Sequence, residues 1–181
     1  MFSSFRKFVG FKILEYFLKY PTEKIHLKEL AKKLQISPRS VKIYCDLFHN
    51  EGIIKREIRG NMHIFTTNND NFRVREMKRV YFINLLAEMD IENIAEESAS
   101  IAIYGSHASG NYDEKSDVDI LIIGQEQQVK RDIIVNIMEE IGKEFQLTVI
   151  PIIKWEKMKK DEDNFVKNII RNHILIKGVE L

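Results

Sequence analysis

The sequence contains little cysteine, proline or tryptophan, and it has no long apolar run. Cys45 is the single cysteine among 181 residues, so no disulfide can form within the chain, and we expect a reducing, cytoplasmic environment. No apolar stretch approaches the length of a membrane span. Charged residues also interrupt the N-terminal segment where a signal peptide would need an apolar core. We therefore expect a soluble protein with no membrane partner. The sequence also has no internal repeats or low-complexity tracts.

The charges are distributed unevenly along the chain, although the net charge is only +1. Residues 1–82 contain 17 Lys and Arg against 8 Asp and Glu, whereas the remainder contains 11 against 19. A basic first part suits a polyanion such as nucleic acid, and an acidic second part suits cations. The alternative is that both excesses are solvated surface. An apolar content of 44% is ample for the packed cores of two small domains.

Three helices are predicted in the first part of the chain. Apolar residues recur with helical spacing before Tyr20-Pro21 and again over residues 27–34. Ser37 and Pro38 indicate the start of a third helix, because serine caps helices and proline fits their first turn. Cys45 falls on the apolar stripe of this helix and is interpreted as a core residue rather than a nucleophile. The stripe predicted for the first helix consists of Phe8, Phe11, Leu14 and Leu18.

Residues 53–59 and 62–67 read as two strands around Gly60-Asn61, a typical hairpin turn. Three helices followed by a basic hairpin resemble the winged helix-turn-helix family over about residues 5–70. The resemblance implies that the third helix enters the major groove of double-stranded DNA while the hairpin contacts phosphates. The alternative is a module for dimerisation or protein docking. The DNA-binding residues implied by the resemblance are Arg39, Ser40, Lys42, Lys55, Arg56 and Arg59.

A further helix is predicted over residues 72–89, and its second half is apolar on more than one face. A helix of this kind must pack on two partners. We therefore expect that it lies between the two domains and contacts a second copy of the chain in a homodimer. The acidic, small-residue stretch at residues 92–100 follows it and indicates a domain boundary.

Residues 101–123 are the most informative segment. An apolar strand ends at Gly105-Ser106, and after a polar loop a second apolar strand opens with Asp117-Val118-Asp119. Residues two apart on a strand share a face and lie roughly 6.6 Å apart, so the two aspartates can converge on shared metal ions. Two like charges this close need a cation between them, since otherwise one carboxylate would take up a proton. The simpler alternative is a plain turn and a solvated acidic pair.

This segment resembles the DNA polymerase β-like nucleotidyltransferase superfamily, especially its minimal nucleotidyltransferase type. The pattern of a strand ending in Gly-Ser, a spacer and Asp-hydrophobic-Asp is matched by Gly105-Ser106, ten residues and Asp117-Val118-Asp119. The combined resemblances imply an α+β protein of two domains, the second with a mixed sheet. We predict a winged helix-turn-helix domain at 1–70, a linker or dimerisation helix at 71–99 and a nucleotidyltransferase α/β domain at 100–181.

The nucleotidyltransferase resemblance also implies roles for individual residues. Asp117 and Asp119 would be catalytic and would hold Mg²⁺ or Mn²⁺. In a two-metal site of this kind, one ion activates the attacking oxygen and the other supports the departing pyrophosphate. A nucleoside triphosphate, expected to be ATP, would be bound by Gly105, Ser106 and Ser116.

A helix is predicted over residues 129–145. The third strand of the predicted domain follows this helix and departs from the family pattern. The segment at residues 146–153 has Thr148 where the family usually presents a further carboxylate, which leaves the second metal one ligand short. His107 is a candidate acid or base, or a simple hydrogen-bond donor to phosphate.

Three functions therefore remain open. The first is an enzyme that transfers a nucleoside monophosphate to a hydroxyl on a protein or small molecule. The second is a DNA-binding transcription regulator with a degenerate, nucleotide-sensing domain. The third is an antitoxin-like module that acts on a partner toxin.

Overall fold

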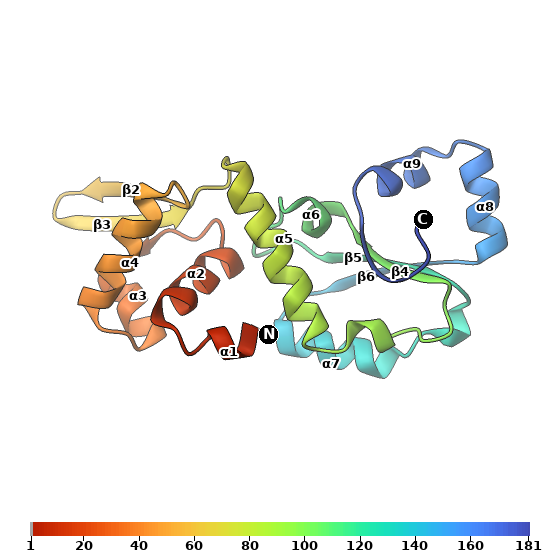
Figure 1. Cartoon of the computed structure of the whole chain (residues 1–181), viewed down its shortest axis with the longest axis horizontal. Helices are drawn as coiled ribbons and strands as arrows, with labels where there is room; N and C mark the ends of the chain where they lie inside the picture. Colours follow the sequence, from red (N-terminus) through yellow and green to blue (C-terminus); the bar gives the residue numbers. More distant parts are fainter. Residues whose placement is uncertain (1) are drawn as a thin grey trace. The chain divides into compact units, whose positions relative to one another are not determined.

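In a computed structural model, residues 2–181 are described, with side chains from Ser4 onward. The chain divides into two compact units, Met1–Asn84 and Leu85–Leu181, and the division falls inside helix α5 (Phe72–Ala87) (Figure 1). The second unit contains a mixed sheet, so the predicted α+β class is confirmed. Within the described residues, every helix is too short or too polar to span a lipid bilayer.

The first unit consists of helices and a small antiparallel sheet. Its helices before α5 are α1 (Phe2–Phe5), α2 (Val9–Lys19), α3 (Leu27–Leu34) and α4 (Pro38–Asn50). Its sheet has the order β1-β3-β2, formed by β1 (Ile25–His26), β2 (Ile54–Arg59) and β3 (Met62–Thr67). Ser37 caps α4 as predicted, because its hydroxyl accepts a hydrogen bond of 3.1 Å from the N–H of Ser40. The predicted helices and hairpin are confirmed, whereas the two-residue strand β1 was not anticipated.

The buried face of α2 differs from the predicted stripe. Phe8 is 63% exposed, and the core of the unit is instead reached by Ile13, Tyr16 and Phe17. Of the predicted stripe, Leu18 is buried and Leu14 packs against the core, so the prediction is right in part. Apolar residues occupy more than one side of α2, so helical spacing alone did not identify the other buried positions. Gly10 allows α2 to approach α4 closely, since a Cβ at this position would lie 2.6 Å from the ring of Tyr44. Cys45 is fully buried in the core, and burial raises the pKa of its thiol to about 12.

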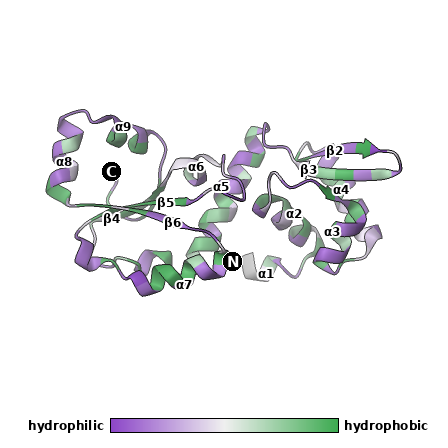
Figure 2. Cartoon of the chain, turned by 180° about the vertical axis from the view of Figure 1, so that it is seen from behind, coloured by the Kyte–Doolittle hydropathy of each residue, from purple (hydrophilic) through white to green (hydrophobic). Residues whose placement is uncertain are grey.

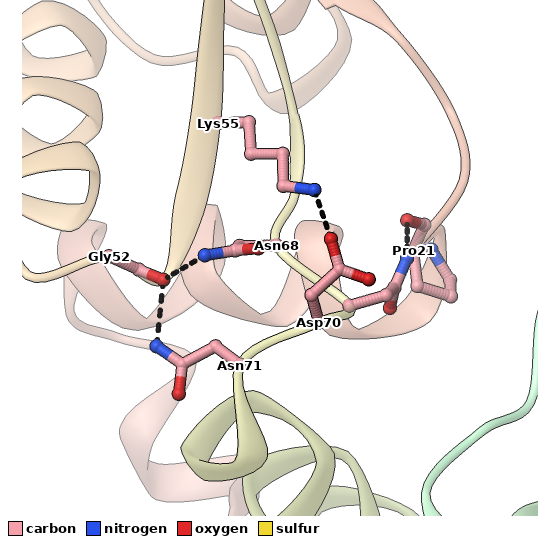
Figure 3. Close-up of polar contacts among 7 residues, drawn as sticks. Pro21, Gly52, Lys55, Asn68, Asp70 and Asn71 are labelled. Carbon is pink, nitrogen blue, oxygen red and sulfur yellow. Dashed lines mark hydrogen bonds and ion pairs between the residues drawn. The ribbon is translucent and has the colours of Figure 1, made fainter.

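Hydrogen bonds fix the segment that joins the hairpin to α5. The side-chain amides of Asn68 and Asn71 both donate to the carbonyl oxygen of Gly52, each over 2.9 Å (Figure 3). The ammonium group of Lys55, on β2, binds the carboxylate of Asp70 in the same segment (Figure 3). The end of α4, the start of β2 and the start of α5 are thereby held together.

The second unit is built on a four-stranded sheet with the order β6-β5-β4-β7. Strands β5 and β6 are parallel, and the other neighbours are antiparallel. The strands are β4 (Ser100–Tyr104), β5 (Val118–Ile123), β6 (Phe145–Ile150) and β7 (Ile174–Gly178). The helical segments are η1 (Ile91–Asn93), α6 (Gly105–Ser109), η2 (Glu126–Gln128), α7 (Arg131–Ile141), α8 (Ile152–Lys160) and α9 (Asn164–Arg171).

Helices cover both faces of this sheet (Figure 1). Side chains of β5 and β6 pack with Trp155 of α8 and with Val166 and Ile169 of α9. Helix α7 lies on the other side of the sheet, and its alternating apolar and polar stretches are visible in Figure 2. Both faces of β5 are therefore covered, which explains its nearly continuous apolar sequence after Asp119.

Two predicted elements of the second unit have different bounds in the structure. The helix expected over residues 129–145 ends earlier, because Gly142 adopts a left-handed conformation with φ of +67°. The strand expected over 146–153 stops at Ile150, because Pro151 has no N–H for the ladder and instead precedes α8. Helix α8 was not predicted from the sequence.

Candidate functional site

The turn between β4 and α6 is shaped by Gly105. Its φ of +69° lies in the left-handed region, which L side chains rarely adopt. The carboxylate of Asp119 occupies the side of Gly105 where a side chain would project. A Cβ built there would lie 2.1 Å from Oδ2 and 3.0 Å from Cγ of Asp119. Position 105 therefore requires glycine for two independent reasons, backbone conformation and space.

The two aspartates lie where β5 begins. Asp117 immediately precedes the strand, and Asp119 is paired in the antiparallel register with Tyr104, the residue before Gly105. Burial, together with the negative charge of Asp117, raises the pKa of the Asp119 carboxyl above its ordinary value. The structure therefore brings Gly105 and Asp119 into contact and Asp117 within electrostatic reach of them. The metal-binding and catalytic roles of these residues stay predictions.

Gln146 is the residue of strand β6 that contacts the aspartate pair. In the parallel register Asp119 is paired with Gln146, and Thr148 is paired with Leu121. The side-chain amide of Gln146 donates a hydrogen bond of 2.7 Å to Oδ2 of Asp117. Thr148 lies two residues further along β6 and shares a face of the strand with Gln146. The prediction that Thr148 replaces a family carboxylate therefore stays a prediction. The contact of Gln146 with Asp117 was not anticipated, because the register of two strands about 30 residues apart has no local signal.

Thr148 has a structural contact of its own. Its hydroxyl lies 2.9 Å from the hydroxyl of Tyr104, on the face of the sheet that is covered by α8 and α9. The ring of Tyr104 in turn makes an edge-to-face contact with Phe165, with 5.8 Å between the ring centroids. Thr148 therefore packs between the sheet and the helices α8 and α9.

The loop before Asp117 is stabilised by Ser116. The hydroxyl of Ser116 donates to Oδ1 of Asp113 over 3.0 Å and accepts the N–H of Asp113 over 2.9 Å. The hydrogen bond from Ser116 is also the main reason that the pKa of Asp113 lies below its ordinary value. Ser116 therefore closes a turn, and its predicted contact with a nucleotide is not tested by this geometry.

Lys143 is a second element of this loop, and sequence reasoning missed it. Its ammonium group donates to three backbone carbonyl oxygens, those of Asp113 at 3.0 Å, Glu114 at 3.3 Å and Ser116 at 3.0 Å. It also lies 5.9 Å from the centroid of the Tyr112 ring. The sequence could not show that Lys143 binds this loop, because the loop lies at least 27 residues earlier in the chain. Lys143 fixes the backbone that leads into Asp117.

His107 lies in the interior rather than at the mouth of the site. Its side chain is fully buried, and its ring stacks on Tyr112 with 4.5 Å between centroids and an angle of 8°. The hypothesis that His107 acts as an acid, a base or a phosphate donor therefore gains no support from its position. Ser106, in contrast, is only half-buried at the start of α6, next to Gly105.

The residues present fit one divalent cation. Asp117 and Asp119 supply hard carboxylate oxygens, the ligands that Mg²⁺ and Mn²⁺ prefer, and Gly105 allows the Asp119 carboxylate to lie against the exposed turn. Burial first, and then the charge of Asp117, raises the pKa of Asp119, so its negative charge is disfavoured here and a bound cation would stabilise it. In the described part of the chain, however, no group of three or more His, Cys, Asp or Glu side chains could hold a metal ion.

The six predicted DNA-binding residues belong to α4 and to β2. Four of the five cations among them form ion pairs within the unit. Asp46 binds Lys42 over 2.8 Å and Arg56 over 3.0 Å. The other two pairs are Lys55 with Asp70 and Arg59 with Glu57.

The remaining two of these residues differ from the paired cations. Arg39 is exposed, and no ion pair of Arg39 occurs among residues 2–181. Ser40 shares a 2.8 Å hydrogen bond with the hydroxyl of Ser37. The outward face of α4 also exposes the apolar side chains of Ile43 and Leu47, at 57% and 48%. The outward face of α4 is therefore partly apolar, and most of the neighbouring cations are already paired with carboxylates.

Comparisons with known proteins concern mainly the second unit. The family model for the nucleotidyltransferase domain matches residues 88–176. A protein of Methanocaldococcus jannaschii named "Putative protein adenylyltransferase" is 30% identical over 82 residues, which span 44% of this chain and 83% of that protein.

Two solved structures show weaker likeness. A toxin-antitoxin crystal structure with AMP-PNP has 13% identity and a TM-score of 0.38, and the match covers 54% of this chain and 74% of that one. A crystal structure from Sulfolobus solfataricus, described as a "putative nucleotidyltransferase", has 20% identity and a TM-score of 0.32, with coverage of 59% and 88%. Both TM-scores lie below 0.5, so these likenesses carry no weight for fold or function.

The family model and the archaeal relative support nucleoside monophosphate transfer as the general chemistry of the second unit. They agree with the Gly-Ser turn and the aspartate pair that the structure brings together. The chain therefore belongs to the nucleotidyltransferase domain family.

Proposed function

We propose that the second unit transfers a nucleoside monophosphate from a nucleoside triphosphate, expected to be ATP, to a hydroxyl of a protein or small molecule. The observation that carries this proposal is the approach of the Asp119 carboxylate to Gly105. Phosphoryl transfer depends on positioning and on charge neutralisation. A side-chain-free turn beside two carboxylates offers both at one place, because phosphates can approach the backbone where a cation can also be held.

Each residue of the site has a proposed role. Asp117 and Asp119 are the catalytic carboxylates and would hold Mg²⁺ or Mn²⁺. Such an ion, when bound, supplies charge neutralisation for the triphosphate. Gly105 and Ser106 bind phosphate oxygens, Ser106 through its hydroxyl. Ser116 contributes to nucleotide binding by keeping the loop before Asp117 in its observed conformation.

The alternative is a regulator whose nucleotidyltransferase domain senses nucleotides without turnover. The specific observation that favours it is the neutral chemistry of β6, where Gln146 and Thr148 are the polar residues nearest to the aspartates in register. A protein toxin is one candidate for the partner in either case, as an acceptor of the transferred group or as a binding partner.

We also propose that the first unit binds double-stranded DNA. Residues 1–70 would act as a winged helix-turn-helix domain, 71–99 as a linker and dimerisation segment, and 100–181 as the nucleotidyltransferase domain. The basic excess of residues 1–82 and the exposed position of Arg39 support DNA contact. The α4 residues Ser40 and Lys42 would join it, with Lys55, Arg56 and Arg59 on the hairpin. The exposed apolar side chains Phe72 and Val80 on α5 support contact with a second copy.

The experiment for transfer uses the full chain with each of four NTPs labelled at the α-phosphate, with Mg²⁺ or Mn²⁺. Acceptors are peptides containing Ser, Thr or Tyr and the chain itself. We expect label on an acceptor, and we expect Asp117→Asn to abolish it. Tight NTP binding without label transfer to any acceptor would favour the sensing function instead.

The experiment for DNA measures binding of the full chain to duplex DNA at several salt concentrations. We expect affinity that falls steeply with salt and that weakens in Arg39→Ala. Binding that is absent or insensitive to salt would favour protein docking by the exposed face of α4.

A further inference from the structure

Gln146 belongs to the aspartate site by position. It lies on the strand next to β5, is paired in register with Asp119 and donates its amide over 2.7 Å to Asp117. Its side chain is exposed, so it reaches the site from the solvent side and is not held by core packing. Both carboxylates thus have Gln146 as their neighbour across the parallel strand pair.

The side chain of Gln146 has nearly the same length as a glutamate side chain but carries no charge. A half-turn of the amide group would present Oε1 in place of Nε2 and offer a neutral oxygen ligand. Two carboxylates balance the charge of one divalent ion. A second ion would depend on phosphate oxygens of the nucleotide for its charge balance, because the protein supplies no third carboxylate beside the first two. No third His, Cys, Asp or Glu side chain completes a metal-binding group in the described part of the chain.

We propose that Gln146 is the third member of the cation site and that its neutral side chain limits this site to one divalent ion per bound nucleotide. This inference rests on the proposed function, because it assumes that Asp117 and Asp119 bind a cation together with a triphosphate. It adds to that function that a single residue, Gln146, determines how many divalent ions the site binds. Gln146→Glu, which has nearly the same length, adds the missing charge and creates a second ion site.

The test counts Mn²⁺ ions bound to the full chain by electron paramagnetic resonance, with a saturating non-hydrolysable ATP analogue. We expect one ion in the wild type and two in Gln146→Glu. Gln127→Glu is the matched control, because it makes the same chemical change at an exposed position beyond the opposite end of β5. The control variant should bind one ion.

A second readout does not depend on nucleotide. In chelator, three adjacent carboxylates repel one another, so Gln146→Glu should have a lower melting temperature than Gln127→Glu. Added Mn²⁺ should remove that difference. This comparison also shows whether Gln146→Glu is folded.

The outcomes separate this inference from the function on which it rests. Two ions in the wild type, or one ion in a folded Gln146→Glu variant, would overturn the role of Gln146 and leave the nucleotide site intact. No bound ion and no bound nucleotide in the wild type would overturn the proposed function itself.

Discussion

The carboxylate of Asp119 occupies the space that a side chain at position 105 would fill, with only 2.1 Å between Oδ2 and a Cβ built on Gly105. This relationship links the turn after β4 to the start of β5. It explains why glycine and aspartate occur together in the motif, since the chain must leave its backbone bare where the carboxylate and its ligand approach.

Gly105→Ala should destabilise the second unit more than backbone strain alone can explain. The left-handed φ of +69° and the clash with Asp119 together should cost roughly 2–4 kcal/mol in the free energy of unfolding. Gly142→Ala is the matched control, because Gly142 has a φ of +67° but nothing within 4 Å of its Cβ position. Urea unfolding of both variants measures the difference, and equal losses would contradict the steric argument.

Asp119→Asn should raise the stability of the metal-free protein at neutral pH. The folded-state pKa of Asp119 is raised, so the folded protein binds a proton more tightly than the unfolded chain does. Stability contributed by this group is therefore present at low pH and is lost as pH rises through the raised pKa. The asparagine variant removes this loss. Melting temperatures in chelator at pH 3 and pH 7 test it, and a variant less stable than the wild type at pH 7 would contradict it.

Lys143→Met should loosen the loop before Asp117. The ammonium group binds three carbonyl oxygens, and the loss of hydrogen bonds to a charged donor should cost about 1.5–3 kcal/mol. Lys130→Met is the control, since its exposed pair with Glu96 should contribute no more than ~1 kcal/mol. Urea unfolding gives both values, and similar small losses would show that Lys143 is only a surface residue.

Asp46→Asn should strengthen DNA binding if α4 and the hairpin contact phosphates. Asp46 pairs with both Lys42 and Arg56, so its neutralisation frees two cations on the proposed surface. We expect an affinity roughly three- to tenfold higher at low salt, with a steeper salt dependence. Glu162→Gln, in the second unit, makes the same change in net charge and should have little effect. If the two variants behave alike, the face of α4 does not contact DNA.

Local features of the sequence were sufficient to predict much of the fold. Ser37 and Pro38 mark the start of α4, and Gly60-Asn61 lies between two strands, because caps and turns are determined by neighbouring residues. The buried side of α2 could be predicted only in part. Leu18 is buried as expected, whereas Phe8 is exposed, since apolar residues lie on more than one side of α2 and tertiary packing selects among them.

The candidate site shows the same division between local and long-range information. The pairing of Gly105 with the aspartates follows from a short motif. The position of Gln146 opposite Asp119 depends on strand register, and the contact of Lys143 with the loop depends on the path of the chain after α7. Neither has a short-range signal, so the sequence gave no indication of the contacts that Gln146 and Lys143 make.

The central claim is that Asp117 and Asp119 bind a cation together with a nucleoside triphosphate beside Gly105. Calorimetric titration of the full chain with a non-hydrolysable ATP analogue, with and without Mn²⁺, tests this claim most directly. We expect Mn²⁺-dependent binding in the wild type and at least roughly tenfold weaker binding in Asp119→Asn. Equal affinities of the wild type and a folded Asp119→Asn variant in Mn²⁺ would contradict the claim.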